Sequence, residues 1–207
     1  MSPRLGILGG SFDPIHIGHL ALAESARAAF NLEQVFFVPT AVPSHKGPPV
    51  AAAEHRLAMV RLASMGNPAF CVEPLELERP GPSYTVDTLV ELGRRYPDRD
   101  LRFIVGADEI LDLADWHEPA RILQLTRFIA ATRPGFDLAR LDQALGRLGP
   151  AARERVDILP WLALGVSSRQ LREMMEVGQP VRYLVPDKVL SYIREHRLYA
   201  AEHGRYA

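Results

Sequence analysis

Short apolar runs alternate along the chain with longer segments of helical composition. The runs are rich in Val, Ile, Leu and Phe, which is typical of buried strands. The predicted strands are Leu5–Leu8, Gln34–Pro39, Phe70–Val72, Leu101–Gly106, Arg127–Thr132 and Val156–Leu159. The predicted helices between them are Gly18–Phe30, Ala52–Met65, Ser83–Tyr96, Trp116–Leu125 and Asp137–Leu148. Because strands and helices alternate throughout, we expect an α/β fold with a mostly parallel sheet and right-handed crossovers.

The C-terminal part, about residues 166–207, is predicted to be a small helical segment. One helix continues through Met174 and Met175, and another opens at Val185-Pro186. We find no repeat, low-complexity tract or linker long enough to divide the chain. A chain of 207 residues can bury one sizeable core, so we predict a single doubly wound domain over residues 1–207.

Composition and charge narrow the class of protein. The formal net charge of −1 argues against a nucleic-acid coat or a polybasic membrane surface. No apolar stretch reaches the roughly 18 residues of a spanning helix, and the N-terminus enters its first strand at once, without a signal peptide. Cys71 is the only cysteine, which excludes an intramolecular disulfide and argues against a cysteine-ligated zinc. We therefore expect a cytoplasmic protein without nucleic-acid or membrane partners; the sequence leaves homo-oligomerisation open.

The junction between the first strand and the first helix is the main candidate for chemistry. It reads Gly9-Gly10-Ser11-Phe12-Asp13-Pro14-Ile15-His16-Ile17-Gly18-His19. Glycines let a ligand approach the backbone, and the start of a helix offers unpaired N–H groups and a positive dipole end, which suits phosphate. His16 and His19 lie three residues apart, where both imidazoles can donate to phosphate oxygens. The alternative is a Gly-rich turn with two surface histidines.

These eleven residues resemble the signature (G)GxFDPxHxGH of the nucleotidylyltransferase superfamily, which implies a Rossmann-like fold of the HxGH type. The resemblance implies that Gly9, Gly10, Ser11 and Phe12 contact ATP, and that His16 and His19 are catalytic. A second stretch, Gly165 to Arg172, resembles the superfamily's ISSTxIR signature. It implies that Ser167, Ser168 and Arg172 bind ATP and that Arg172 is also catalytic. Arg169 departs from the threonine of that signature, and its role is open; a serine at a helix start is otherwise a cap.

Further segments resemble bacterial nicotinate mononucleotide adenylyltransferases more narrowly. The loop Pro43–Pro49 carries His45 and Lys46, matching an HK pair that would add positive charge near bound phosphate; the alternative is a solvated loop. Ser83, Tyr84 and Thr85 match the SYTxDTL stretch, whose backbone amides meet the pyridine carboxylate. The alternative for this stretch is a Ser or Thr helix cap.

Two strand ends offer further candidates. Gly106 and Asp108 follow a buried strand, where an acidic residue can accept hydrogen bonds from ribose hydroxyls, so we assign both to ATP. Arg133 follows the next strand, and its fork geometry suits phosphate, whereas most other arginines lie in helical segments. Trp116 resembles the family tryptophan that stacks on nicotinate; packing in the core is the alternative. The Val181–Tyr199 segment resembles the family's YLVPxxVxxYI stretch and is interpreted as packing.

The resemblance implies transfer of the adenylyl group of ATP to nicotinate mononucleotide, giving deamido-NAD and pyrophosphate in NAD biosynthesis. Mg²⁺ is the expected cofactor; it would bridge the ATP phosphates largely through water, with no protein ligand assigned. The acceptor-side candidates are His45, Lys46, Ser83, Tyr84, Thr85, Trp116 and Arg133. Alternatives are nicotinamide mononucleotide or phosphopantetheine as acceptor, a cytidylyltransferase, and a non-catalytic nucleotide-binding regulator.

Overall fold

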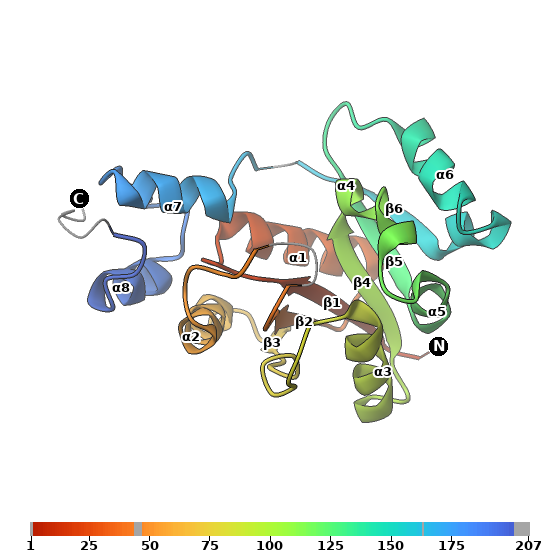
Figure 1. The fold of residues 1–207 in the computed structure, drawn as a ribbon, viewed down its shortest axis with the longest axis horizontal. Coiled ribbons are helices and arrows are strands. Elements are labelled where there is room, and N and C mark those ends of the chain that lie inside the picture. The colour runs from red at the N-terminus through yellow and green to blue at the C-terminus, as the bar shows by residue number, and fades with distance from the viewer. Residues whose placement is uncertain (1, 44–46, 163, 201–207) are drawn as a thin grey trace. The chain divides into compact units, whose positions relative to one another are not determined.

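The computed structural model describes residues 2–43, 47–162 and 164–200. Its strands form one six-stranded sheet with the order β3-β2-β1-β4-β5-β6 (Figure 1). The strands are β1 (Arg4–Gly10), β2 (Gln34–Pro39), β3 (Phe70–Val72), β4 (Asp100–Gly106), β5 (Arg127–Thr132) and β6 (Val156–Pro160). β4 pairs in parallel with β1 and β5, and β5 with β6, so the predicted α/β fold with a parallel sheet is confirmed.

Helices connect these strands along the chain. They are α1 (Ile17–Phe30), α2 (Ala53–Ser64), α3 (Thr85–Arg95), α4 (Ala107–Ile110), α5 (Pro119–Leu125), α6 (Leu138–Gly146), α7 (Ser168–Glu176) and α8 (Asp187–Glu195). Two 3₁₀ turns, η1 (Leu113–Asp115) and η2 (Pro150–Arg155), complete the list. The predicted C-terminal helical segment is therefore present as α7 and α8. In the part of the chain that the structure describes, no helix has both the length and the apolar character needed to cross a membrane; a cytoplasmic location stays a prediction.

The chain forms two compact units, each built from three separate stretches. The first unit comprises Met1–Gly9, Leu22–Phe36 and Ser83–Ala163, and the second comprises Gly10–Ala21, Phe37–Pro82 and Leu164–Ala207. The single domain expected over residues 1–207 stays a prediction.

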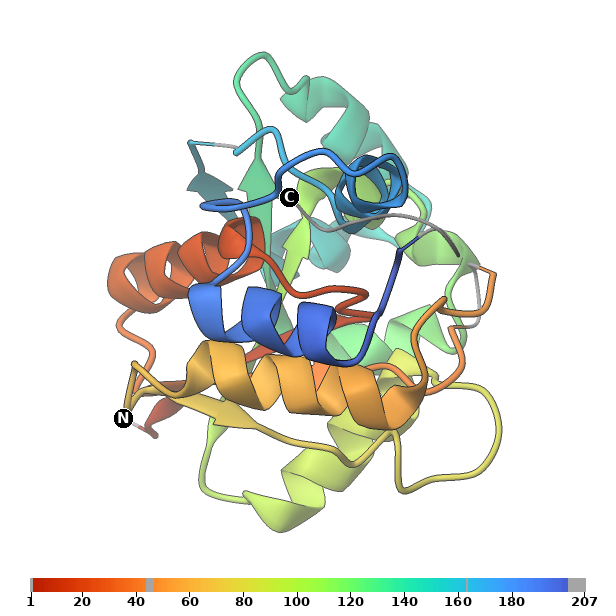
Figure 2. The ribbon, with the colours of Figure 1, turned by 90° about the vertical axis from the view of Figure 1, so that its left-hand side faces the viewer.

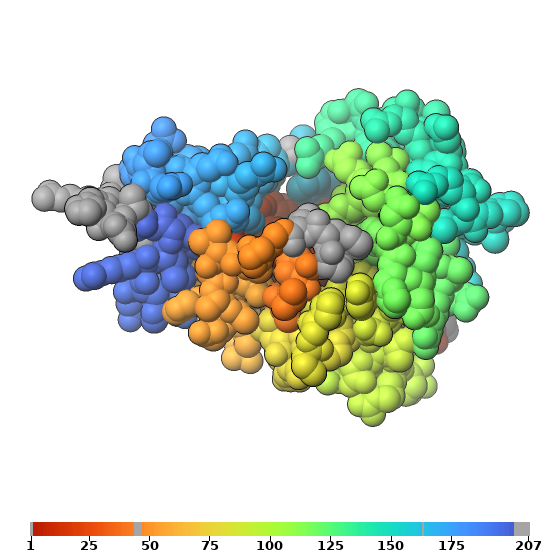
Figure 3. All heavy atoms as spheres, in the orientation of Figure 1, coloured from red at the N-terminus to blue at the C-terminus, as the bar shows by residue number. Residues whose placement is uncertain are grey.

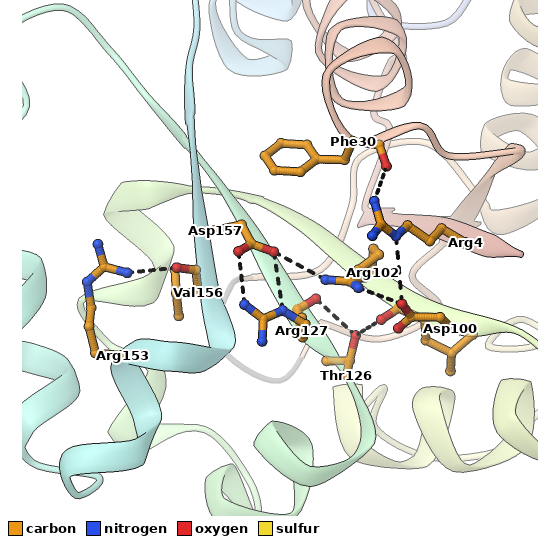
Figure 4. Close-up of polar contacts among 10 residues, drawn as sticks. Arg4, Phe30, Asp100, Arg102, Thr126, Arg127, Arg153, Val156 and Asp157 are labelled. Atoms are coloured by element: carbon orange, nitrogen blue, oxygen red, sulfur yellow. Dashed lines mark hydrogen bonds and ion pairs between the residues drawn. The ribbon is translucent and has the colours of Figure 1, made fainter. Parts of the chain in front are cut away.

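The first unit carries a polar network at the amino-terminal ends of its strands (Figure 4). Asp157 on β6 accepts hydrogen bonds from Arg127 on β5, at 3.0 and 3.3 Å, and from Arg102 on β4, at 3.2 Å. Arg102 also binds Asp100, and Arg4 on β1 donates to the carbonyl of Phe30. Arg102 and Arg127 lie on the strands where the sequence pattern placed them, and each of these arginines contacts a carboxylate or a carbonyl.

In the second unit, α2 and α8 lie side by side (Figure 2). Buried Met59 and Val60 on α2 and buried Ile193 on α8 contribute to the core of this unit. The side chain of His55 on α2 meets Tyr192 on α8, with 2.9 Å between the imidazole Nδ1 and the phenol oxygen. α7 forms part of the surface of the same unit (Figure 3).

Three local predictions differ from the structure. Gly9 and Gly10 lie within β1 and not in the turn that follows it. α5 begins at Pro119 and not at Trp116, because Glu118 adopts a left-handed φ of 51° that interrupts the helix. α3 begins at Thr85 and not at Ser83, and the side chain of Tyr84, the residue before the helix, forms no capping hydrogen bond.

Candidate functional site

The turn between β1 and α1 is shaped by Phe12. Its φ of +48° is the left-handed conformation, which a non-glycine residue adopts only under constraint from its surroundings. The Phe12 ring is buried, 5.1 Å from the His19 ring and 5.9 Å from the Phe37 ring, measured between centroids. A Cβ on Gly10 would lie 3.3 Å from the Phe12 ring, so the glycine makes room for this ring. Gly9 similarly faces Phe103, whose ring lies 3.4 Å from the position of a Cβ.

The two histidines of the turn are held by backbone N–H groups. The N–H of Gly18 donates to His16 Nδ1, and the N–H of His16 donates to His19 Nδ1, both at 3.2 Å. A ring nitrogen that accepts a hydrogen bond carries no proton, so in each neutral imidazole the proton lies on Nε2. Both rings therefore present Nε2–H as their donor.

Burial keeps both histidines neutral. Burial lowers the pKa of His16 from 6.5 to about 4. The pKa of His19 is also lowered well below 6.5, by burial and by the neighbouring His16. The Nε2–H groups of this pair are therefore neutral donors near pH 7, before any anion binds.

The start of α7 is tied to the same turn. Ser167 caps the helix by accepting from the N–H of Gln170 at 3.3 Å, and Ser168 Oγ donates to the carbonyl of Pro14 at 2.9 Å. Arg172 donates to the carbonyl of Asp13 at 2.6 Å, and the guanidinium lies 3.6 Å from the Asp13 carboxylate. The structure thus brings Ser167, Ser168 and Arg172 to the turn that carries His16 and His19, as the two signatures predict. Arg169 in the first turn of α7 is exposed.

Asp13 is the centre of this arrangement. Its carboxylate is only 2% exposed and accepts hydrogen bonds from the N–H of Val50 at 2.7 Å and the N–H of Ala51 at 3.1 Å. The hydroxyl of Tyr199 donates to it as well, at 2.7 Å. Burial and this bond to Asp13 raise the pKa of Tyr199, so the phenol stays protonated.

A buried guanidinium supports the turn from the side of α2. Arg56 is 1% exposed, and burial lowers its pKa, although an arginine keeps its charge in a protein. Its side chain donates to four backbone carbonyls, those of Ser11, Thr40, Ala41 and Ala51. The residues before and after the Pro43–Pro49 loop are thereby joined to the turn. His45 and Lys46 themselves lie outside the described residues.

In the first unit, the predicted residues Gly106, Asp108 and Arg133 lie at neighbouring strand ends. Gly106 is the last residue of β4 and pairs with Ala131 of β5, and Asp108 follows in α4. Arg133 comes directly after β5, and its Nε lies 3.9 Å from the Asp108 carboxylate. Both side chains are exposed, which leaves them accessible to a polar ligand.

Trp116 and Tyr84 bring aromatic rings to the same unit. The Trp116 ring meets Phe103 and Phe128 edge to face, at centroid distances of 6.4 and 6.2 Å, and remains half-buried. Tyr84 lies against His117, with ring centroids 4.4 Å apart. Trp116 therefore packs on the core with one part of its ring system and is exposed with another. Ser83 and Thr85, on either side of Tyr84, are half-buried.

Sequence reasoning missed three residues of the second unit. Arg56 stands on the buried face of α2 with Met59, and an arginine at an apolar position of a helix is a signal that could have found it. Asp13 belongs to the first signature, but its backbone partners in the loop are not visible in a motif. Tyr199, interpreted as packing, is separated from Asp13 by 186 positions, and no local pattern connects the two.

Comparison with known proteins adds a family. The model of the cytidylyltransferase-like family matches residues 7–177. A protein of Symbiobacterium thermophilum named "Probable nicotinate-nucleotide adenylyltransferase" is 49% identical over 197 residues, which cover 95% of each chain. A protein of Moorella thermoacetica with the same name is 46% identical over 198 residues, 95% of this chain and 91% of its own.

Solved structures resemble this one at lower identity. Plasmodium falciparum nicotinic acid mononucleotide adenylyltransferase, complexed with APC, has a TM-score of 0.73 and 18% identity, and the match covers 95% of this chain and 97% of that one. The same protein complexed with NaAD has a TM-score of 0.73 and 20% identity, with the same coverage. At this identity the likeness concerns the fold.

Proposed function

The chain belongs to the cytidylyltransferase-like family and, within it, to the nicotinate-nucleotide adenylyltransferases, and we propose that it transfers the adenylyl group of ATP to nicotinate mononucleotide. The resemblance to nicotinate mononucleotide adenylyltransferases is confirmed by these relatives, and the predicted Rossmann-like fold by the solved neighbours. The products are deamido-NAD and pyrophosphate.

The observation that carries the chemistry is the donor arrangement of the two histidines. Backbone N–H groups occupy both Nδ1 atoms, which directs the Nε2–H donors of His16 and His19 away from the turn's own backbone. Two preorganised donors in a buried setting stabilise charge that develops on phosphate oxygens more than water does. Arg172 and the N-terminus of α7 supply further positive charge at the same turn.

The reaction needs no general base. A phosphate oxygen of nicotinate mononucleotide is already anionic near pH 7 and attacks the α-phosphorus of ATP. A P–O bond forms there while the bond from the α-phosphorus to the bridging oxygen breaks, and pyrophosphate leaves with that electron pair. His16, His19 and Arg172 hold the triphosphate in line and stabilise the negative charge on the leaving group.

Mg²⁺ bound to the ATP phosphates would neutralise part of their charge. Residues 2–43, 47–162 and 164–200 contain no cluster of three or more His, Cys, Asp or Glu side chains placed to hold a metal ion. The buried carboxylate of Asp13 already accepts from Val50, Ala51 and Tyr199. The residues present therefore fit an ion carried by the phosphates and water, with the chain binding the phosphates.

On the acceptor side, Trp116 stacks on the pyridine ring, and backbone amides of Ser83, Tyr84 and Thr85 bind its carboxylate. Lys46, His45 and Arg133 bind the mononucleotide phosphate, while Gly106 and Asp108 bind the ATP ribose. The exposed part of Trp116 and the exposed Arg133 and Asp108 support these roles.

Pyrophosphate release tests the proposal directly. ATP is offered with nicotinate mononucleotide, nicotinamide mononucleotide or phosphopantetheine, and CTP replaces ATP in a fourth arm. We expect pyrophosphate release above background only in the arms that contain ATP. Among these arms, kcat/KM should be highest with nicotinate mononucleotide. A higher kcat/KM with another acceptor contradicts the proposed substrate, and no release in any arm favours a non-catalytic nucleotide-binding protein.

A further inference from the structure

The carboxylate of Asp13 divides its partners between its two oxygens. Oδ1 accepts from the hydroxyl of Tyr199 at 2.7 Å and from the N–H of Ala51 at 3.1 Å. Oδ2 accepts from the N–H of Val50 at 2.7 Å and lies 3.6 Å from Arg172 Nη1. The tyrosine and the arginine thus approach opposite oxygens of one buried carboxylate.

The distance between the Arg172 guanidinium and the Asp13 carboxylate determines whether Arg172 is available to bind an anion. At 3.6 Å the guanidinium does not form a hydrogen bond with the Asp13 carboxylate, although Nη1 donates to the main-chain carbonyl of Asp13 at 2.6 Å. Arg172 is therefore held beside the turn with donors left for an anion. A direct, bidentate pair with Asp13 would instead occupy those donors.

Tyr199 disfavours a direct, bidentate pair between Arg172 and Asp13. A neutral hydroxyl donor on Oδ1 stabilises the carboxylate and holds its plane, so the carboxylate depends less on Arg172 for charge compensation. When this donor is removed, the buried carboxylate keeps its charge with one partner fewer. Arg172, already only 3.6 Å away, is a cation placed to compensate, whereas the guanidinium of Arg56, which also interacts with Asp13, is bound to four backbone carbonyls.

The backbone around Tyr199 is constrained to deliver the hydroxyl. Tyr199 has a φ of +63° and Arg197 a φ of +52°, both in the left-handed region that side chains disfavour. The chain turns back after α8, where the N–H of Leu198 donates to the carbonyl of Ile193 at 3.0 Å. Such conformations persist where the surrounding contacts hold them, and the bond to Asp13 is one of these contacts.

From these contacts we propose that Tyr199 is a positioning residue, which acts through Asp13 to keep the guanidinium of Arg172 available to the phosphates of ATP. This inference rests on the proposed function, because it assigns the anion at Arg172 to the nucleotide. In this proposal, Tyr199 itself contacts no reacting atom of the substrates.

The test is the Tyr199→Phe variant, which removes only the hydroxyl. We expect the KM for ATP to rise about tenfold, the size of one hydrogen bond to a charged group, with the KM for nicotinate mononucleotide nearly unchanged. In the Arg172→Ala background the same substitution should have little further effect, because its target is gone. Tyr192→Phe is the matched control: it removes another hydroxyl of the C-terminal segment, bound to His55 and not to Asp13.

ATP binding can be measured without the proposed reaction, so it tests the role of Tyr199 separately from the function. ATP is titrated calorimetrically into the wild type and into the Tyr199→Phe and Tyr192→Phe variants without a mononucleotide, and thermal unfolding is recorded for each. Weaker ATP binding by Tyr199→Phe alone supports the positioning role even where no acceptor reacts. Equal losses in both tyrosine variants, additive losses with Arg172→Ala, or unchanged ATP binding overturn it, and a wild type that does not bind ATP overturns both proposals.

Discussion

The ring of His16 lies stacked on the ring of His19, with centroids 3.8 Å apart and ring planes 30° apart. Two imidazolium rings this close would repel each other strongly, and the neighbouring His16 is indeed one cause of the lowered pKa of His19. Phe12 packs edge-on against His19. The stacked pair is therefore a rigid, neutral donor unit whose affinity for protons increases when a polyanion binds.

Removing one ring of this pair should remove most of the activity. We expect His19→Ala to lower kcat by about 10²-fold to 10³-fold, because a preorganised donor to the transition state is lost. Pyrophosphate release measures the effect, and far-UV circular dichroism checks the fold. The control is His196→Ala, which removes an exposed imidazole of the same unit. Near-native turnover of the folded His19→Ala protein would contradict a catalytic role.

Stability should depend on pH through the same pair. The pKa of His16 is about 4 in the folded state against 6.5 in the unfolded chain, so the unfolded chain takes up the proton first as the pH falls. The stabilisation is fully present above pH 6.5 and is lost as the pH falls to about 4; for His16 it is on the order of 3 kcal/mol. His19 contributes in the same direction.

Urea unfolding between pH 4 and 7.5 measures this dependence. As the pH is lowered, the free energy of unfolding should decrease less steeply in a His16→Asn variant than in the wild type, because that variant lacks the titrating ring. Equal slopes for the wild type and the variant would show that His16 titrates with an ordinary pKa in the folded protein.

Trp116→Ala should affect substrate binding and stability together. Its contacts with Phe103 and Phe128 predict a loss of about 2 kcal/mol in the free energy of unfolding. If its exposed part stacks on the pyridine ring, the KM for the mononucleotide also rises more than the KM for ATP. Trp116→Phe should recover part of both losses. Equal changes in the two KM values would leave Trp116 as a packing residue only.

Arg56→Met should destabilise the second unit. The variant replaces the guanidinium by a shorter apolar side chain and removes this donor from four buried or half-buried carbonyls, which should cost about 3 kcal/mol. Arg61→Met is the matched control on α2, because Arg61 is exposed. Chemical denaturation compares the two, and similar stabilities would show that Arg56 contributes no more than a surface arginine.

The network at the strand starts of the first unit can be tested in the same way. Asp157→Asn removes the charge that Arg102 and Arg127 share, and Arg102 is largely shielded from water, so we expect a loss of about 1 to 2 kcal/mol. Asp142→Asn, which breaks the exposed pair with Arg153, should cost less than about 0.5 kcal/mol. A larger effect at Asp142 would contradict this ranking.

The order of strands and helices was predictable because it depends on local pattern. The inner strands are largely buried, so they leave short apolar runs in the sequence, as in Phe103–Val105 of β4. Helix starts were less predictable. The helix expected from Trp116 begins at Pro119, after Glu118 with its left-handed φ. Proline favours the first position of a helix and disfavours a helical conformation in the residue before it, so Pro119 was the signal for this start.

The candidate site was predictable only where it coincides with a motif. The signatures identified His16, His19 and Arg172, and the structure brings these residues to one turn. The tautomer of each histidine could not be predicted, because it depends on which backbone N–H reaches Nδ1. Tyr199 contacts Asp13, 186 positions away, so it became visible only in the folded chain. Arg56 left a signal in the sequence, an arginine on the apolar face of α2.

The interleaving of the two units limits how this protein can be divided. The chain passes from one unit to the other after Gly9, Ala21, Phe36, Pro82 and Ala163. No contiguous fragment therefore contains one whole unit without stretches of the other, and during synthesis the first unit has all its parts only once Ala163 has been added. A design that cuts the chain once, at any position, therefore divides at least one of the two units between the pieces.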